Sequence, residues 1–248
     1  MKNHIIISLL FLSVGLSQQE YNYNDLIEMD NGLWTVKFSD EPITGLVYDY
    51  FGENNKKVYI GNLRSGKQDG KWVSYYHSTG KKVFEYNFKD GERDGLQTEW
   101  YENGQKKIEQ TYMDGKLDGL NTGWYENGQK KIEQTYMDGK LDGLNTIWYE
   151  NGQKRLGLNN KDGKLDGLST LWYENGQKKQ EGTYKDNIPD GEYKCWNKDG
   201  GVIYETEFVN GTGVLIEFYE NEQMGEEMIY KNGEIIEFKF FEPYYNKD

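Results

Sequence analysis

The chain has 248 residues, 35% of them hydrophobic and 29% charged, and it carries a formal net charge of −13 at pH 7. This acidic balance argues against nucleic acid and against an anionic membrane surface as partners, because both attract clustered Lys and Arg. The low apolar fraction alone would suit a disordered chain, but 21 Tyr, 10 Phe and 7 Trp favour ordered strands, and 30 Gly with only 3 Pro indicate many tight turns.

The chain begins with the features of a secretory signal peptide. Lys2 is followed by a 12-residue apolar run, residues 5–16, and small residues precede Gln18. This layout predicts a signal peptide over residues 1–17 that is removed from the mature chain. The run is shorter than the roughly 20 residues that span a bilayer, and no later segment is apolar enough to be a transmembrane segment. We therefore expect a secreted, periplasmic or cell-envelope protein; a buried N-terminal strand is the alternative interpretation of the same run.

The segments that flank the centre of the chain differ from it in pattern. Residues 18–30 are polar and unpatterned, which indicates a short linker. Residues 31–44 alternate large apolar with polar side chains, which predicts an N-terminal cap strand. A repeat array is expected over residues 45–233. Residues 234–248 are interpreted as a closing strand followed by a polar tail.

The array is most regular near its middle. The blocks Gly95–Asp118 and Gly119–Asp142 are identical except at positions 97/121 and 99/123. A fixed period of this size indicates stacked supersecondary units that each contact mainly their neighbours. The glycines that open successive units are Gly45, Gly70, Gly95, Gly119, Gly143, Gly167, Gly191 and Gly213.

Each unit reads as one β-hairpin. Side chains alternate with period 2 before Asn103-Gly104, a pair that favours a tight hairpin turn because both residues tolerate positive φ. A return strand is expected over about Gln105–Tyr112, and Met113–Gly119 then forms a longer turn into the next unit. The chain is therefore predicted to be all-β, an elongated meander of stacked β-hairpin repeats in which neighbours stabilise each otherwise marginal hairpin.

These residues resemble the bacterial variant form of the MORN repeat. The shared pattern is Trp/Tyr-Tyr-Glu-Asn-Gly-x-Lys-Lys, then Glu-Gly-x-Tyr-Lys-Asp or a near version, then Gly-Lys-x-Asp-Gly. It is best at Trp172–Asp190, is clear at Trp100–Gly119 and Trp124–Gly143, and covers about Gly45–Gly233. The resemblance implies a single twisted antiparallel sheet used for protein interaction or scaffolding. The stretch before the repeats is similar to exported bacterial proteins of an antitoxin-like repeat family.

The sequence contains little that could support catalysis. The two histidines, His4 and His77, form no Cys/His pair or zinc pattern, and no Gly-x-Ser-x-Gly elbow or phosphate loop is present. We therefore expect no enzyme activity, no cofactor and no metal. The acidic turn at Asp114 could offer oxygen ligands to calcium, but Asp-Gly is typical of turns and each turn also carries a lysine. The single cysteine, Cys195, is predicted to be a buried free thiol.

The two faces of the hairpins vary differently from unit to unit. The face with the Leu, Thr and Trp of the first strand is constant, which favours packing. On the opposite face positions 97 and 99 vary beside constant tyrosines, and exposed apolar and aromatic patches mark interaction sites. Period 2 leaves open which face is covered, and neutral variation on a solvated face is the alternative. The candidate binding residues are Glu99, Tyr101, Tyr125, Ile147, Tyr149, Leu171 and Tyr173.

Repetition without catalytic residues predicts an exported, non-enzymatic repeat protein that binds another protein or acts as a scaffold. The alternatives are binding of carbohydrate or cell-envelope glycan through exposed aromatic side chains, and a passive spacer. The packing of the array can be tested at Trp148. Alanine there is expected to destabilise the chain by roughly 3–5 kcal/mol if the ring is buried, and by less than about 0.5 kcal/mol if it is exposed.

Overall fold

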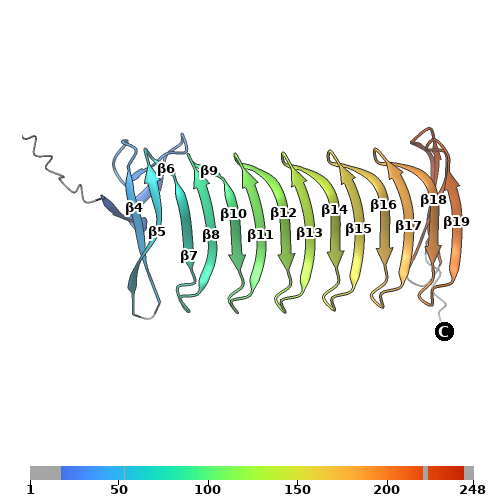
Figure 1. Ribbon diagram of the computed structural model, residues 1–248, viewed down its shortest axis with the longest axis horizontal. Coiled ribbons are helices and arrows are strands. Elements are labelled where there is room, and N and C mark those ends of the chain that lie inside the picture. The colour runs from blue at the N-terminus through green and yellow to red at the C-terminus, as the bar shows by residue number, and fades with distance from the viewer. Residues whose placement is uncertain (1–17, 53, 220–222, 243–248) are drawn as a thin grey trace, which may run out of the picture.

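Figure 1 shows the computed structural model, in which residues 18–52, 54–219 and 223–242 are described. The predicted signal peptide and residues 243–248 of the predicted tail lie outside this part. The described residues form strands, turns and one 3-10 turn, Tyr23–Asp25, and include no helix long and apolar enough to cross a membrane. The strands follow one another along the long axis of the molecule (Figure 1). The prediction of an all-β, elongated hairpin meander is confirmed.

Thirteen strands form one antiparallel sheet. Their bounds are β7 Gly70–Tyr75, β8 Lys82–Lys89, β9 Glu92–Arg93, β10 Gly95–Trp100, β11 Lys106–Met113, β12 Lys116–Trp124, β13 Lys130–Met137, β14 Lys140–Trp148, β15 Lys154–Lys161, β16 Lys164–Trp172, β17 Lys178–Lys185, β18 Ile188–Trp196 and β19 Val202–Phe208. Strand order in the sheet follows chain order, except that β9 pairs only with β8. Apart from the pairing of β8 with β10, which passes over β9, every pairing is between neighbours in sequence, and the turns set its register.

Two kinds of turn connect these strands. In the first, the Gly104 N–H donates to the Tyr101 carbonyl at 2.9 Å, and the Asn103 Oδ1 atom accepts the Gln105 N–H at 2.9 Å. The second places Asp114 at φ 46° and the next glycine at φ 78°. Two consecutive left-handed residues match the twist of an antiparallel pair, which is why Asp-Gly stands at this point of the repeat.

Pairing gives the array a variable face, which carries positions 97 and 99, and a constant face, which carries positions 96, 98 and 100. The predicted packing of the constant face is wrong for its leucines, because no second layer covers this single sheet. Only the threonines there are buried, at 4–6% exposure: Thr98, Thr122, Thr146 and Thr170. The leucines are 46–54% exposed: Leu96, Leu120, Leu144 and Leu168. Trp148 is partly buried, between the two outcomes expected for it.

A separate sheet caps the N-terminal end of the array (blue in Figure 1). It contains β1 (Glu20–Asn22), β4 (Gly45–Phe51), β5 (Lys56–Arg64) and β6 (Lys67–Gln68), with β1 parallel to β4. A hairpin of β2 (Leu26–Glu28) and β3 (Trp34–Val36) joins this cap, and the Trp34 N–H donates to the Gly66 carbonyl at 2.8 Å. The buried core of the cap is Leu26, Ile43, Val47, Phe51, Ile60, Leu63 and Trp72.

Side-chain packing connects this cap to the array. Trp72 of β7 is 4% exposed, and its Nε1–H donates to the Asn62 carbonyl at 3.1 Å. A Cβ at Gly61 would lie 2.2 Å from the indole ring, so the close approach requires glycine. The predicted linker, residues 18–30, instead contains β1, β2 and the 3-10 turn. The polar sequence of this segment gives no strand pattern, and β1 forms because it pairs with β4, a strand that is distant in sequence.

A second cap covers the C-terminal end. It is a three-stranded sheet of β20 (Gly213–Phe218), β21 (Met224–Lys231) and β22 (Glu234–Phe240). The predicted closing strand is present as β22, but the expectation that the last unit continues the array sheet is wrong. The cap packs on the variable face of β18 and β19, because large apolar side chains replace the polar ones of earlier units and require cover. The shared core is Tyr193, Cys195, Phe208 and Leu215.

The cap predicts slow labelling of its thiol. Cys195 is buried and free, as expected from the sequence, and burial raises its pKa to about 11. At pH 8 the thiolate population should therefore be more than about a hundredfold below that of an unperturbed cysteine. We expect native protein to react with a thiol reagent at least that much more slowly than protein unfolded in urea. Equal rates in the two states would contradict the docked cap.

Candidate binding surface

The variable face carries a line of branched apolar side chains between the two caps. Register places Ile108 opposite Gly123 and Gly123 opposite Ile132, and the line continues through later units. All of its side chains are partly exposed. This apolar row consists of Ile108, Ile132, Ile147, Leu156 and Leu171. Glu99 precedes it, and Gln180 separates its end from Cys195, which lies beneath the C-terminal cap.

Positions 97, 121 and 145 form a parallel line of amides, which is buried rather than presented to a ligand. Gln97, Asn121 and Asn145 are 1%, 7% and 6% exposed. The Asn121 Nδ2–H donates to the Gln134 Oε1 atom at 3.1 Å, so the line bonds across strands. The expectation that the variable position 97 belongs to an exposed interaction surface is therefore wrong. A polar side chain in a single-layer sheet is covered by its larger neighbours on adjacent strands.

The constant tyrosines hold successive units together. The hydroxyls of Tyr101, Tyr125, Tyr149 and Tyr173 donate to the backbone carbonyls of Trp124, Trp148, Trp172 and Trp196, at 2.7–2.9 Å. Each bond spans 23 residues and joins the turn of one unit to the end of the first strand of the next unit, as from Tyr149 to the end of β16. In the same turns, each Asn Nδ2–H donates to the carbonyl that lies 23 residues later. Their constancy thus has a structural cause that the sequence analysis missed.

We expect Tyr149→Phe to lower stability by about 0.5–1.5 kcal/mol, the usual net contribution of one hydrogen bond. The lost bond is the one from the Tyr149 hydroxyl to the Trp172 carbonyl, at 2.8 Å. Tyr76→Phe is the matched control, because the Tyr76 hydroxyl is 3.4 Å from the Trp100 carbonyl and contributes less. Urea unfolding followed by circular dichroism would compare the two. A larger loss for Tyr76→Phe would be inconsistent with the tyrosine contacts described.

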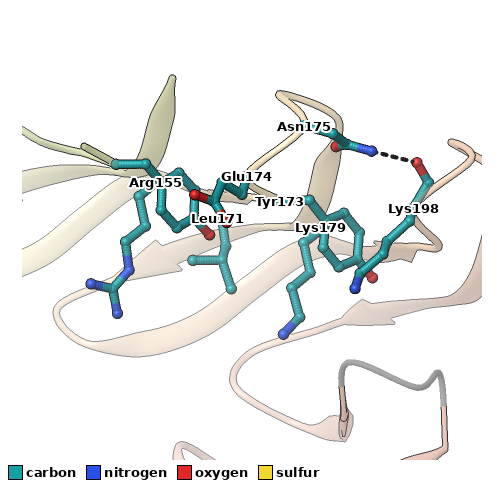
Figure 2. Close-up of a pocket in the computed structure, with 8 residues that line it drawn as sticks. Arg155, Leu171, Tyr173, Glu174, Asn175, Lys179 and Lys198 are labelled. Atoms are coloured by element: carbon teal, nitrogen blue, oxygen red, sulfur yellow. Dashed lines mark hydrogen bonds between the residues drawn. The ribbon is translucent and has the colours of Figure 1, made fainter. Parts of the chain in front are cut away.

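The end of the apolar row opens into a cavity of about 490 Å³ (Figure 2). Three of the predicted binding residues, Tyr149, Leu171 and Tyr173, line this cavity, and they come from two successive units. The side chains of the two tyrosines lie beside cationic groups that the sequence analysis did not single out. The lining residues are Tyr149, Arg155, Leu171, Tyr173, Glu174, Asn175, Lys179 and Lys198.

The cavity is positively charged although the chain as a whole is acidic. Three cations and one carboxylate line it. The Arg155 guanidinium lies 6.0 Å from the ring centroid of Tyr149, and the Lys179 and Lys198 ammonium groups lie 5.8 and 5.9 Å from that of Tyr173. Within the part of the chain that is described, neither Arg155 nor Lys179 belongs to a salt bridge. The site can therefore accept an anionic group beside an apolar one.

A sequence signal for this cavity did exist. Lys198 stands at the turn position that is Glu102, Glu126, Glu150 and Glu174 in earlier units, so the charge reverses there. The tyrosine of the turn is replaced in the same unit by Asn197. A comparison of charges position by position, rather than of the variable face alone, would have located the basic cluster.

The remaining predicted residues lie elsewhere. Ile147 belongs to the apolar row, next to Leu156. Tyr101 and Tyr125 occupy earlier turns and do not line the cavity. Glu99 accepts a hydrogen bond from the Tyr86 hydroxyl and pairs with Lys107 at 3.4 Å. Burial, together with that carboxylate, raises the pKa of Tyr86 to about 12.

The acidic turns stack on one another. The Asp118 Oδ2 atom accepts the Asp138 N–H at 3.1 Å, and Asp142 does the same for Asp162. Their carboxylates thus bond to the next turn, as side-chain turn chemistry predicts. Among the described residues, no group of three or more His, Cys, Asp or Glu side chains is placed to hold a metal ion.

Comparison with protein families supports the repeat assignment. The family model described as the MORN repeat variant matches residues 93–114, 117–138, 165–186 and 189–210. The matched segments begin 24 residues apart or at a multiple of that spacing. The unmatched residues between the second and third segments include Arg155–Asn160, where the repeat departs from its pattern. The resemblance to MORN repeats is therefore confirmed for these four segments. No curated protein matches the chain.

Proposed function

We propose that the protein is an exported, non-enzymatic interaction module that binds another protein on the variable face between its two caps. The observation that carries this proposal is the cavity, where Leu171 and two tyrosine rings adjoin a cluster of cations. MORN repeats are generally interaction modules, which supports a binding or scaffolding role. An exposed apolar row that ends in such a cavity offers a surface on which a partner protein can bury apolar side chains.

The chemistry of the cavity indicates the kind of partner. Arg155 and Lys179 present charge beside aromatic rings, a setting in which a carboxylate is bound through charge-assisted hydrogen bonds. The apolar row leads into the cavity and would bury aliphatic side chains of the same segment. The partner is therefore an acidic, partly apolar polypeptide segment. It would bind across the strands that carry Ile147, Leu156 and Leu171.

A pair of variants tests this proposal. Leu171→Glu places a carboxylate in the cavity, whereas Leu168→Glu changes an equally large residue, 46% exposed, on the constant face of the same strand. Cell-envelope proteins captured by the wild-type chain should be lost with Leu171→Glu and kept with Leu168→Glu. Identical capture by both variants would contradict binding through the cavity.

Export follows from the predicted signal peptide over residues 1–17. The mature chain isolated from the producing cells should begin at Gln18, which N-terminal sequencing would establish. A cytoplasmic protein that retains residues 1–17 would contradict the proposed export. A bacterial periplasmic or secreted protein fits these features better than a cytoplasmic antitoxin does.

Glycan binding is the weaker alternative. The hydroxyls of Tyr149 and Tyr173 donate to backbone carbonyls, and cationic side chains lie near both rings, so fewer polar groups remain for a sugar. Strong signals on a glycan array that disappear in Tyr149→Ala and Tyr173→Ala variants would favour this alternative over protein binding.

A further inference from the structure

The last strand, β22, is an exposed apolar sheet edge. It pairs with β21 on one side and has no strand partner on the other side among the described residues. All seven of its residues are exposed. The four largest apolar side chains, Ile235, Ile236, Phe238 and Phe240, are 52%, 59%, 54% and 58% exposed. Such an edge is a template for a further strand, and proteins usually protect it with charge, proline or cover.

The protection of this edge is incomplete. Lys239 is the one lysine on the strand, and its ammonium group pairs with Glu227 at 2.7 Å and with Glu237 at 3.1 Å. The Phe241 N–H donates toward β21, to the Gly225 carbonyl at 2.9 Å. Because main-chain groups alternate in direction along a strand, those of Phe240 and Phe238 point to the open side. The main-chain N–H and C=O groups of Phe238 and Phe240 are therefore available for hydrogen bonds to another strand.

The sequence of the edge is complementary to itself. In an antiparallel pair centred on Phe238, Glu237 faces Lys239 of the second copy, and Lys239 faces Glu237. In the same register Ile236 faces Phe240. Opposite charges and large apolar side chains are the cross-strand pairs that stabilise antiparallel sheets. Centring the pair on Glu237 or on Lys239 instead sets like charges opposite each other.

We propose that two copies of the chain dimerise by antiparallel pairing of their β22 strands around Phe238. The two C-terminal sheets then form one six-stranded sheet across a twofold axis, an isologous contact that closes on itself. This surface is separate from the apolar row and the cavity, and the dimer goes beyond the proposed partner binding. It presents two open variable faces in one assembly.

Charge exchange at the edge tests the register. The probe is the chain from Gln18 onward, studied by sedimentation velocity from about 1 to about 100 μM, a range that spans micromolar dissociation constants. Wild-type protein should approach twice its monomer mass. Glu237→Lys and Lys239→Glu should each remain monomeric, since each sets like charges opposite. A mixture of the two variants should dimerise, because each supplies the charge that the other lacks.

Two further variants separate the interface from folding. Phe238→Pro removes an N–H from the open side only and should abolish the dimer, with the Cys195 thiol still protected from labelling. Val202→Lys alters an apolar side chain of similar exposure, 55%, on β19 and should leave the dimer intact. A wild-type chain that stays monomeric at every concentration would overturn the proposal. So would a dimer that survives Glu237→Lys, or a mixture of the charge variants that fails to associate.

Discussion

Replacing Trp72 with alanine is expected to destabilise the N-terminal cap by about 3–5 kcal/mol, the cost of removing a large buried aromatic side chain. The indole is 4% exposed, and it is the one array side chain in the buried core of that cap. Its ring lies against Gly61, and its Nε1–H bonds to the Asn62 carbonyl at 3.1 Å. The variant should therefore lose the attachment of β4 and β5 to β7 before the middle of the array is affected.

Hydrogen exchange as a function of urea would measure this loss, because it reports the opening of β4 and β5 separately from that of the array. Trp148→Ala is the matched control. Its ring is only partly buried, and we expect a loss of about 1–2 kcal/mol, near the centre of measured point-mutant effects. Equal losses for the two tryptophans would mean that Trp72 does not anchor the cap.

The second large effect is expected at Phe208. Phe208→Ala should release the C-terminal cap at a cost of about 3–5 kcal/mol. The ring is 2% exposed and lies 6.3 Å from that of Tyr193 and 5.8 Å from that of Tyr230, measured between centroids. Since the cap buries Cys195, its release should raise the labelling rate of that thiol by at least about a hundredfold, as such a free-energy change implies.

Phe238→Ala is the control for this experiment, at a protein concentration too low for dimers. It removes the same kind of side chain as Phe208→Ala, but from β22 of the cap, at a site that is 54% exposed, and it should leave the labelling rate nearly unchanged. If Phe208→Ala labelled no faster than Phe238→Ala, the docking of β20 to β22 on the array would be wrong.

The sequence predicts the array well because its contacts are local. Asn103-Gly104 and Asp114-Gly115 define turns between adjacent strands, and period 2 then defines the hairpins without reference to distant residues. The structure of the two caps is harder to predict from the sequence, because it depends on contacts between distant residues. β1 pairs with β4 across a long stretch of chain, and the C-terminal sheet leaves the array after Phe208 to pack on its face.

The candidate site was predicted in part. Leu171, Tyr149 and Tyr173 do line one cavity, but the tyrosines are constant because their hydroxyls join successive units. Variation at position 97 suggested a displayed surface, whereas the amides there are buried between strands. Arg155 and Lys198 come to line one cavity only when units stack, so this cavity could not be predicted from spacing within a unit.

The contacts that span 23 residues make the length of this molecule adjustable. If Gly119–Asp142 were deleted, the Tyr101 hydroxyl would meet the Trp148 carbonyl in place of that of Trp124, and every junction would be rebuilt from identical parts. Each unit contributes two strands, or about 10 Å, to the separation of the caps. The gain or loss of one unit would therefore change the distance between the two caps and leave the structure of both caps unaltered.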